Sequence, residues 1–221
     1  MSDQIERIRT KIGDAARLPR QSQNAYLIDK NDRDFFRFFG ADHHQFRMNS
    51  PAPARQVVDW ESRYRISLPT PYRSFLEQVG NGGAGPYYGL FPLERWSEGC
   101  NVAGEVLEDW PGSPCLLRER FPDDPDDEAW LVEVGGPDWE DRFNAGKWGP
   151  MVGSLTLCEV GCGGYVYLIL NGPLEGRVCF QEHLAKPKFW PQRNFLDWYE
   201  GWLDYVLAGD PRPFNGGPPD K

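Results

Sequence analysis

The chain has 221 residues, of which 40% are hydrophobic and 14% aromatic, enough to bury a sizeable core in one large domain. Its formal net charge is −9 and its sequence pI is about 4.9. This charge argues against nucleic acid or an anionic membrane as a direct partner, because both favour a basic face. No apolar run approaches the ~18 residues of a membrane span. Residues 1–18 lack the apolar segment of a secretory signal, so we expect a cytoplasmic protein.

The N-terminal residues predict an amphipathic helix over 3–18. Ile5, Ile8 and Ile12 share one face of this helix, charged residues occupy the other, and Pro19 ends it. A second, short helix is expected through a cluster of four phenylalanines and ends at Gly40. These rings either dock the N-terminal segment onto the main domain or form an exposed partner-binding patch. The four are Phe35, Phe36, Phe38 and Phe39.

Neither the histidines nor the cysteines form a recognisable catalytic or metal-binding pattern. His43 and His44 follow Asp42, but no nucleophile or orienting group accompanies them, so we predict turn or surface roles. The five cysteines are an odd number and favour reduced thiols, most simply small buried side chains. We therefore predict no catalytic residue, no metal and no cofactor. The cysteines are Cys100, Cys115, Cys158, Cys162 and Cys179.

Two helices are predicted in the first half of the main domain, over residues 54–64 and 69–79. In the second, Thr70 is the candidate N-cap and Pro71 is tolerated in the first turn. Apolar residues recur at the spacing i, i+3, i+4, i+7, which places them on one helix face. They are Tyr72, Phe75, Leu76 and Val79.

A glycine-rich turn follows the second of these helices. Gly80, Gly82 and Gly85 form a G-x-G-x-x-G pattern, which in dinucleotide-binding proteins follows a strand and opens a helix. Here a helix precedes the pattern and an aromatic strand over 87–93 is expected after it, so we reject a cofactor site. We predict instead that the glycines allow a tight turn and close backbone packing.

Residues 121–128, FPDDPDDE, concentrate acidic side chains in a segment that its prolines keep out of helix and sheet. The pattern lacks the ligand spacing and the glycine of an EF-hand loop. Two alternatives stay open: a solvated, self-repelling loop, or an electrostatic lure for a basic partner that Asp138, Glu140 and Asp141 extend. The acids of the loop are Asp123, Asp124, Asp126, Asp127 and Glu128.

The second half of the chain predicts strands, then a closing helix over 194–207 with Asn194 as its N-cap. Short turns at 161–164 and 171–173 favour antiparallel neighbours. The predicted strands are Trp130–Val134, Met151–Val160, Tyr165–Leu170 and Arg177–Gln181, with a further short strand at 115–117.

Two sets of residues in this order resemble the SUKH superfamily, which groups bacterial toxin-immunity proteins with fungal cell-wall assembly regulators. The first set is Trp60, Glu61, Leu68, Pro69, Tyr72, Gly80, Asn81, Gly82 and Gly83. The second is Gly161–Gly164, Tyr167, Leu168, Gly176–Val178 and Phe195–Trp198. The resemblance covers residues 40–207 and implies a single α+β domain that binds a protein partner and performs no known chemistry.

The element order and the resemblance together predict an α+β fold. We expect a curved, mostly antiparallel sheet of about five or six strands with the helices packed on one face. Residues 1–40 should form a helical extension packed on the main domain, 41–209 the SUKH-like domain, and 210–221 a flexible tail.

We predict a non-enzymatic immunity protein that occludes the active site of a cognate, nuclease-type toxin with a basic cleft. The alternative is an intracellular regulatory or scaffold interaction domain. Exposed aromatic residues are expected to anchor the partner because Trp and Tyr dominate hot spots. The predicted anchors are Trp110, Trp139, Tyr87 and Tyr88, and the predicted acidic rim is Asp123, Asp124, Asp126, Asp127, Asp138 and Asp141.

Overall fold

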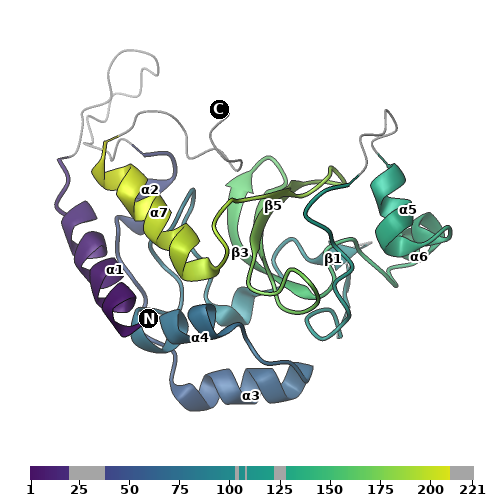
Figure 1. Cartoon of the computed structure of the whole chain (residues 1–221), viewed down its shortest axis with the longest axis horizontal. Helices are drawn as coiled ribbons and strands as arrows, with labels where there is room; N and C mark the ends of the chain where they lie inside the picture. The colour runs from purple at the N-terminus through teal and green to yellow at the C-terminus, as the bar shows by residue number, and fades with distance from the viewer. Residues whose placement is uncertain (20–37, 103–104, 108, 122–127, 210–221) are drawn as a thin grey trace.

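The computed structural model describes residues 1–19, 38–102, 105–107, 109–121 and 128–209 (Figure 1). The helices are α1 (Ser2–Ala15), α2 (Ala41–His44), α3 (Ala54–Tyr64), α4 (Thr70–Gln78), α5 (Ala129–Gly135), α6 (Trp139–Asn144) and α7 (Phe195–Leu207), with one 3-10 turn, η1 (Leu93–Arg95). The strands are β1 (Asn101–Val102), β2 (Glu105–Val106), β3 (Ser154–Gly161), β4 (Gly164–Ile169), β5 (Val178–Glu182) and β6 (Lys188–Phe189). Phe35, Phe36, the four aspartates of the acidic loop and the tail 210–221 lie outside the described residues.

The main sheet has four strands in the order β3-β4-β5-β6, and every neighbouring pair is antiparallel. The β3–β4 hairpin turns through Cys162 and Gly163, both at positive φ (53° and 81°), as a two-residue primed turn requires. Most side chains of β3 and β4 are buried, so both faces of this part of the sheet are covered.

The core on the helical side is aromatic and joins α4 to α7. Phe75 packs edge-on against Phe195 and Tyr199, with ring centroids 5.0 and 4.7 Å apart. The Tyr199 hydroxyl donates a hydrogen bond to the Ala84 carbonyl (2.8 Å) in the glycine-rich segment. Asn194 caps α7 as expected, since its side-chain oxygen accepts from the Asp197 amide (3.0 Å). Figure 1 shows α1, α4 and α7 on one side of the sheet and α5 and α6 at the opposite end of the molecule.

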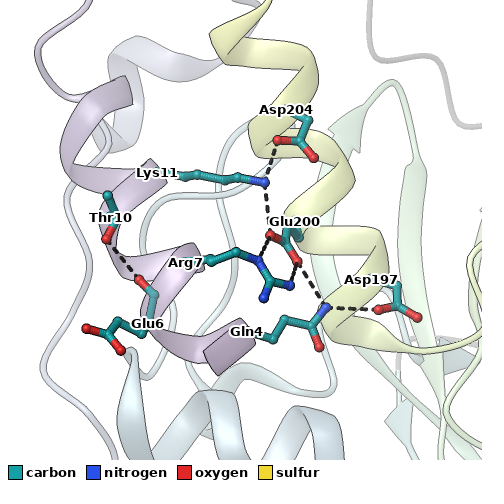
Figure 2. Close-up of polar contacts among 8 residues, drawn as sticks. All are labelled: Gln4, Glu6, Arg7, Thr10, Lys11, Asp197, Glu200 and Asp204. Carbon is teal, nitrogen blue, oxygen red and sulfur yellow. Dashed lines mark hydrogen bonds and ion pairs between the residues drawn. The ribbon is translucent and has the colours of Figure 1, made fainter. Parts of the chain in front are cut away.

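Helix α1 packs along α7 through an apolar stripe and a charged cluster. Ile5, Ile8 and Ile12 are buried. Glu200 of α7 accepts hydrogen bonds from Arg7 (2.9 and 3.0 Å) and from Lys11 (2.9 Å). Four further polar contacts surround this carboxylate (Figure 2). They are Gln4–Asp197, Gln4–Glu200, Lys11–Asp204 and, within α1, Thr10–Glu6.

The structure corrects three expectations about strands. The main sheet has four strands, not five or six. Residues Trp130–Val134 form a helix, α5, although their composition favours a strand, because Trp130, Leu131 and Val134 bury one helical face while Val132 stays exposed. Among described residues, 87–93 and 115–117 form no strand. The first segment makes one isolated bridge, Gly83 to Leu90, and positive φ at Tyr87 and Gly89 interrupts any longer ladder.

Candidate functional site

A groove of about 290 Å³ lies between helix α3 and the 3-10 turn η1. We call it the α3–η1 groove. The segment that contains η1 is held on β3 by two hydrogen bonds: the Phe91 amide donates to the Leu157 carbonyl (2.7 Å), and the Thr156 amide donates to the Trp96 carbonyl (2.9 Å). The residues lining the groove are Gln56, Asp59, Trp60, Arg63, Tyr64, Leu93, Glu94 and Trp96.

Three aromatic rings form the wall of this groove. Trp60 and Tyr64 lie one helical turn apart on α3, with ring centroids 4.8 Å apart, because residues spaced i, i+4 share a helix face. Trp96 packs edge-on against Tyr64 at 5.1 Å, and its indole N–H donates to the Tyr64 hydroxyl (3.2 Å). The two tryptophans are largely buried, so the wall is rigid, whereas Tyr64 is half-buried and faces outward.

The rim of the groove carries two carboxylates and one guanidinium. Glu94 is held by hydrogen bonds from Asn81 Nδ2 (3.1 Å) and from Gln56. Asp59 makes an exposed pair with Arg55 (3.7 Å). The Arg63 guanidinium lies over the Tyr64 ring, 5.4 Å from its centroid.

The glycine-rich turn fixes the position of Glu94. Asn81 also accepts a hydrogen bond from the Leu93 amide (2.7 Å), so one side chain orients both the start of η1 and its carboxylate. Gly82 and Gly83 have positive φ, and a Cβ at either would lie 2.6 Å or less from a backbone atom, Pro92 N or Arg47 O. The prediction of tight turning and close packing is confirmed.

Other motif residues shape the same half of the domain. Glu61 accepts from the Leu68 amide (2.8 Å) and pairs with Arg73 (2.8 Å), which fixes the connection from α3 to α4. Leu68 and Tyr72 are buried, and Pro69 precedes α4 as its N-cap, one residue before the predicted Thr70. These contacts are structural.

The predicted aromatic anchors do not form one exposed set. Trp110, Trp139 and Tyr87 are 2, 8 and 9% exposed, so the expectation that they stand at the surface is wrong. Trp139 packs against Gly135 on the buried side of α6, and burying such large rings removes the most apolar surface from water. Tyr88 alone is half-buried.

Tyr88 belongs to a small surface cluster beside α2, which we call the Tyr88 cluster. Its ring lies 5.2 Å from Phe39 and 4.9 Å from His43. Phe39 is 59% exposed, whereas Phe38 packs against Tyr205 of α7. Of the two described rings, Phe38 therefore docks on the main domain as one alternative predicted, and Phe39 is exposed, while partner binding by Phe39 stays a prediction.

The two described residues of the predicted acidic rim, Asp138 and Asp141, lie at the other end of the molecule. Asp138 and Asp141 are exposed at the start of α6, while Asp123, Asp124, Asp126 and Asp127 fall outside the described residues. Helices α5 and α6, which we call the acidic helix pair, lie far from α2 in Figure 1, so these acids do not surround Tyr88. The acids of the pair are Glu128, Glu133, Asp138, Glu140 and Asp141, and the nearby bases are Arg118, which pairs with Glu133 (3.8 Å), Arg142 and Lys147.

The titratable core residues suit packing better than catalysis. Burial raises the pKa of the Cys100 thiol to about 12 and lowers that of His44 to about 4. All five cysteines are free, and only Cys162 is exposed. No group of three or more His, Cys, Asp or Glu within the described ranges is placed to hold a metal ion.

Sequence reasoning missed the α3–η1 groove as a site. The spacing of Trp60 and Tyr64 was visible, but η1 is separated from α3 by a helix and the glycine turn. Long-range side-chain contacts bring the two elements together: Gln56 donates to Glu94, and Trp96 packs on Trp60 and Tyr64.

Comparison with known proteins identifies the family to which the domain belongs. No helix in the described part of the chain is both long and apolar enough to cross a membrane. No curated protein and no solved structure matches the sequence. The SMI1 / KNR4 family (SUKH-1) matches over residues 51–201, more than half of the chain. That range runs from the entry to α3 into α7 and includes the α3–η1 groove. The chain therefore belongs to the SMI1 / KNR4 family, SUKH-1.

Proposed function

We propose that this chain is a non-enzymatic, cytoplasmic immunity protein that binds a cognate bacterial toxin and covers its active site. The SUKH superfamily joins toxin-immunity proteins and intracellular regulators, so family membership supports a binding role. The toxin we propose is of the nuclease type, because a cleft that binds nucleic-acid phosphates is basic and this chain carries a net charge of −9.

The observation that carries this proposal is the exposed acidic helix pair. Five acids lie on or beside α5 and α6, against three nearby bases of which Arg118 pairs with Glu133 (3.8 Å), and Val132 between them is 47% exposed. An apolar side chain inside an acidic rim suits a complementary basic surface, because opposite charge speeds encounter and disfavours wrong partners. Asp123, Asp124, Asp126 and Asp127 immediately precede Glu128 in sequence and extend the same charge.

The test is titration of the protein with the toxin encoded next to its gene, at about 50 and 300 mM salt. The α6 variant combines Asp138→Asn, Glu140→Gln and Asp141→Asn. It should lower the association rate about tenfold at low salt and flatten its salt dependence, because surface charges act mainly on encounter. A second variant neutralises the four aspartates of residues 123–127 and should act in the same direction.

The matched control removes the same charge from α1, with Asp3→Asn, Glu6→Gln and Asp14→Asn. These residues lie outside the family match and far from α6 (Figure 1). The control should leave the association rate within about twofold. Tight binding whose rate changes neither with salt nor in the two acidic-residue variants would contradict the electrostatic part of the proposal. Absence of any complex would contradict the immunity role.

A second function, a regulatory or scaffold interaction domain, is favoured by the Tyr88 cluster. An exposed aromatic surface beside α2 and an acidic surface at α6 lie at opposite ends of the molecule. Such a separation suits a protein that joins two partners. Capture of two different proteins, one lost with Phe39→Ala and the other with the α6 variant, would favour this alternative.

A further inference from the structure

We propose that the α3–η1 groove receives an arginine side chain of the protein partner. The inference rests on the proposed function only in requiring a protein partner, and it assigns a chemical specificity to a different surface. It follows from the size of the groove, from its aromatic wall, from its carboxylates and from the position of Arg63.

The size of the groove fits one side chain. At about 290 Å³, it falls just below the roughly 300–1,000 Å³ range of pockets that enclose small-molecule ligands and cofactors. It opens between two surface elements, α3 and η1, so a side chain projecting from a partner can enter without any movement of the core.

The wall of the groove has the chemistry that attracts a delocalised cation. Trp60, Tyr64 and Trp96 all line the groove and pack on one another at centroid distances of 4.8 to 6.4 Å, so the groove has a continuous aromatic lining. Aromatic faces attract cations, and a planar guanidinium also stacks on them. Arginine is therefore preferred to lysine.

The rim supplies the counter-charge at a fixed position. Glu94 is held by Asn81 and Gln56, so its carboxylate is oriented before any partner arrives. Asp59 of α3 also lines the groove, and it pairs with the exposed Arg55 at 3.7 Å. A guanidinium between these carboxylates can form paired N–H···O bonds, which an ammonium group cannot match.

Arg63 shows that a guanidinium can lie against the aromatic wall of the groove. Its own guanidinium lies over the Tyr64 ring, 5.4 Å from the centroid, from the adjacent position on α3. Arg63 is exposed, so it can swing into solvent. In the free protein it serves as an internal substitute that the arginine of the partner displaces, and it therefore competes with the partner.

The test measures binding of N-acetyl-L-arginine amide to the isolated protein by NMR of the tryptophan indole N–H signals. The comparison compound is N-acetyl-L-citrulline amide, which has nearly the same shape and no charge. Arginine amide should shift the Trp60 and Trp96 signals at millimolar concentration, and citrulline amide should not. Equal shifts from both compounds, or none from arginine amide, would overturn the proposal.

Substitutions of the residues that line the groove should change its affinity for arginine amide in opposite directions. Arg63→Ala removes the competitor and should tighten arginine-amide binding about threefold, whereas Tyr64→Leu should weaken it about tenfold. Asp59→Asn and Glu94→Gln should each weaken it severalfold while keeping side-chain shape. Because Tyr64→Leu also removes packing, its thermal midpoint is measured alongside, and the two isosteric variants test the proposal without that loss.

The matched control is Arg95→Ala. Arg95 also lies over an aromatic ring, Phe91 at 4.3 Å, and stands on η1 itself, but it does not line the groove. This variant removes the same charge and should leave arginine-amide binding unchanged. A gain equal to that of Arg63→Ala would show that net charge alone controls binding, which overturns the proposal.

The outcomes also separate this inference from the proposed function. If the toxin binds but arginine amide does not, the groove proposal fails and the immunity role stands. If arginine amide binds as described but no toxin does, the groove proposal stands and the immunity role fails.

Discussion

Arg7 and Glu200 lie 193 positions apart in the chain and meet in a two-point contact, with Nε and Nη2 of the arginine 2.9 and 3.0 Å from the two carboxylate oxygens. This contact joins α1, which lies outside the family match, to α7, which closes the domain. Figure 2 shows Lys11 and Gln4 approaching the same carboxylate from α1. Glu200 is therefore the centre of the polar interface between these helices.

We expect Glu200→Gln to lower the free energy of unfolding by about 2 kcal/mol, because hydrogen bonds to charged groups that are largely buried contribute more than neutral ones. The measurement is urea denaturation at pH 7. The control is Asp14→Asn, which breaks an exposed pair with Arg17 and should cost less than about 0.5 kcal/mol. Equal losses in the two variants would contradict a special role for Glu200.

The Glu200 carboxylate should also make the free energy of unfolding fall at acidic pH. The Arg7 guanidinium, ahead of the smaller contributions of Lys11 and Gln4, lowers the pKa of Glu200 from 4.5 to about 2 despite partial burial. A lowered folded-state pKa stabilises the protein fully above the unfolded-state value, and this stabilisation is lost as pH falls from about 4.5 to about 2. The stability difference between wild type and Glu200→Gln should shrink across that window. A difference independent of pH would contradict this assignment.

His44 should act in a separate, higher pH window. Burial lowers its pKa from 6.5 to about 4, and its Nδ1 accepts a hydrogen bond from the Phe46 amide (3.0 Å), which requires the unprotonated ring. Stability from this group is complete above about pH 6.5 and is lost as pH falls toward 4, since the unfolded chain binds the proton first. His44→Asn keeps an acceptor near the Nδ1 position and does not titrate. The variant should therefore show a shallower fall in melting temperature between pH 6.5 and 4 than the wild type. Parallel curves would contradict the prediction.

Position 83 in the glycine-rich turn should tolerate no side chain. At Gly83, φ is +107° and a Cβ would lie 2.5 Å from the Arg47 carbonyl oxygen, so Gly83→Ala should cost about 3 kcal/mol or more from strain and overpacking. Gly13 offers the matched control, because it lies inside α1 with no atom within 4 Å of its Cβ position. Gly13→Ala should stabilise the protein by about 0.5–1 kcal/mol through helix propensity. Thermal and urea unfolding of both variants test the pair, and similar losses would show that close packing is not what Gly83 provides.

The amino-acid sequence determined four of the helices, the β3–β4–β5 hairpins and the family. Helical periodicity and capping are local properties, so α1, α3, α4 and α7 were found within about three residues of their observed ends. The Cys162–Gly163 turn and the Asn194 cap were equally readable, because each depends on a few neighbouring residues.

The tertiary structure decided the rest. The sequence of a short apolar segment such as Trp130–Val134 is compatible with either a helix or a strand. In the folded chain, packing of this segment against its neighbours favours the helix. Burial of Trp110 and Trp139, and exposure of Phe39, depend on which surfaces the fold covers, and composition does not encode this. The α3–η1 groove exists because contacts such as Gln56–Glu94 and Trp96–Tyr64 bring segments together that are distant in the sequence. Sites assembled from such long-range contacts carry no local sequence signal, so the family and the net charge can be read from the sequence, whereas the groove is visible only in the folded chain.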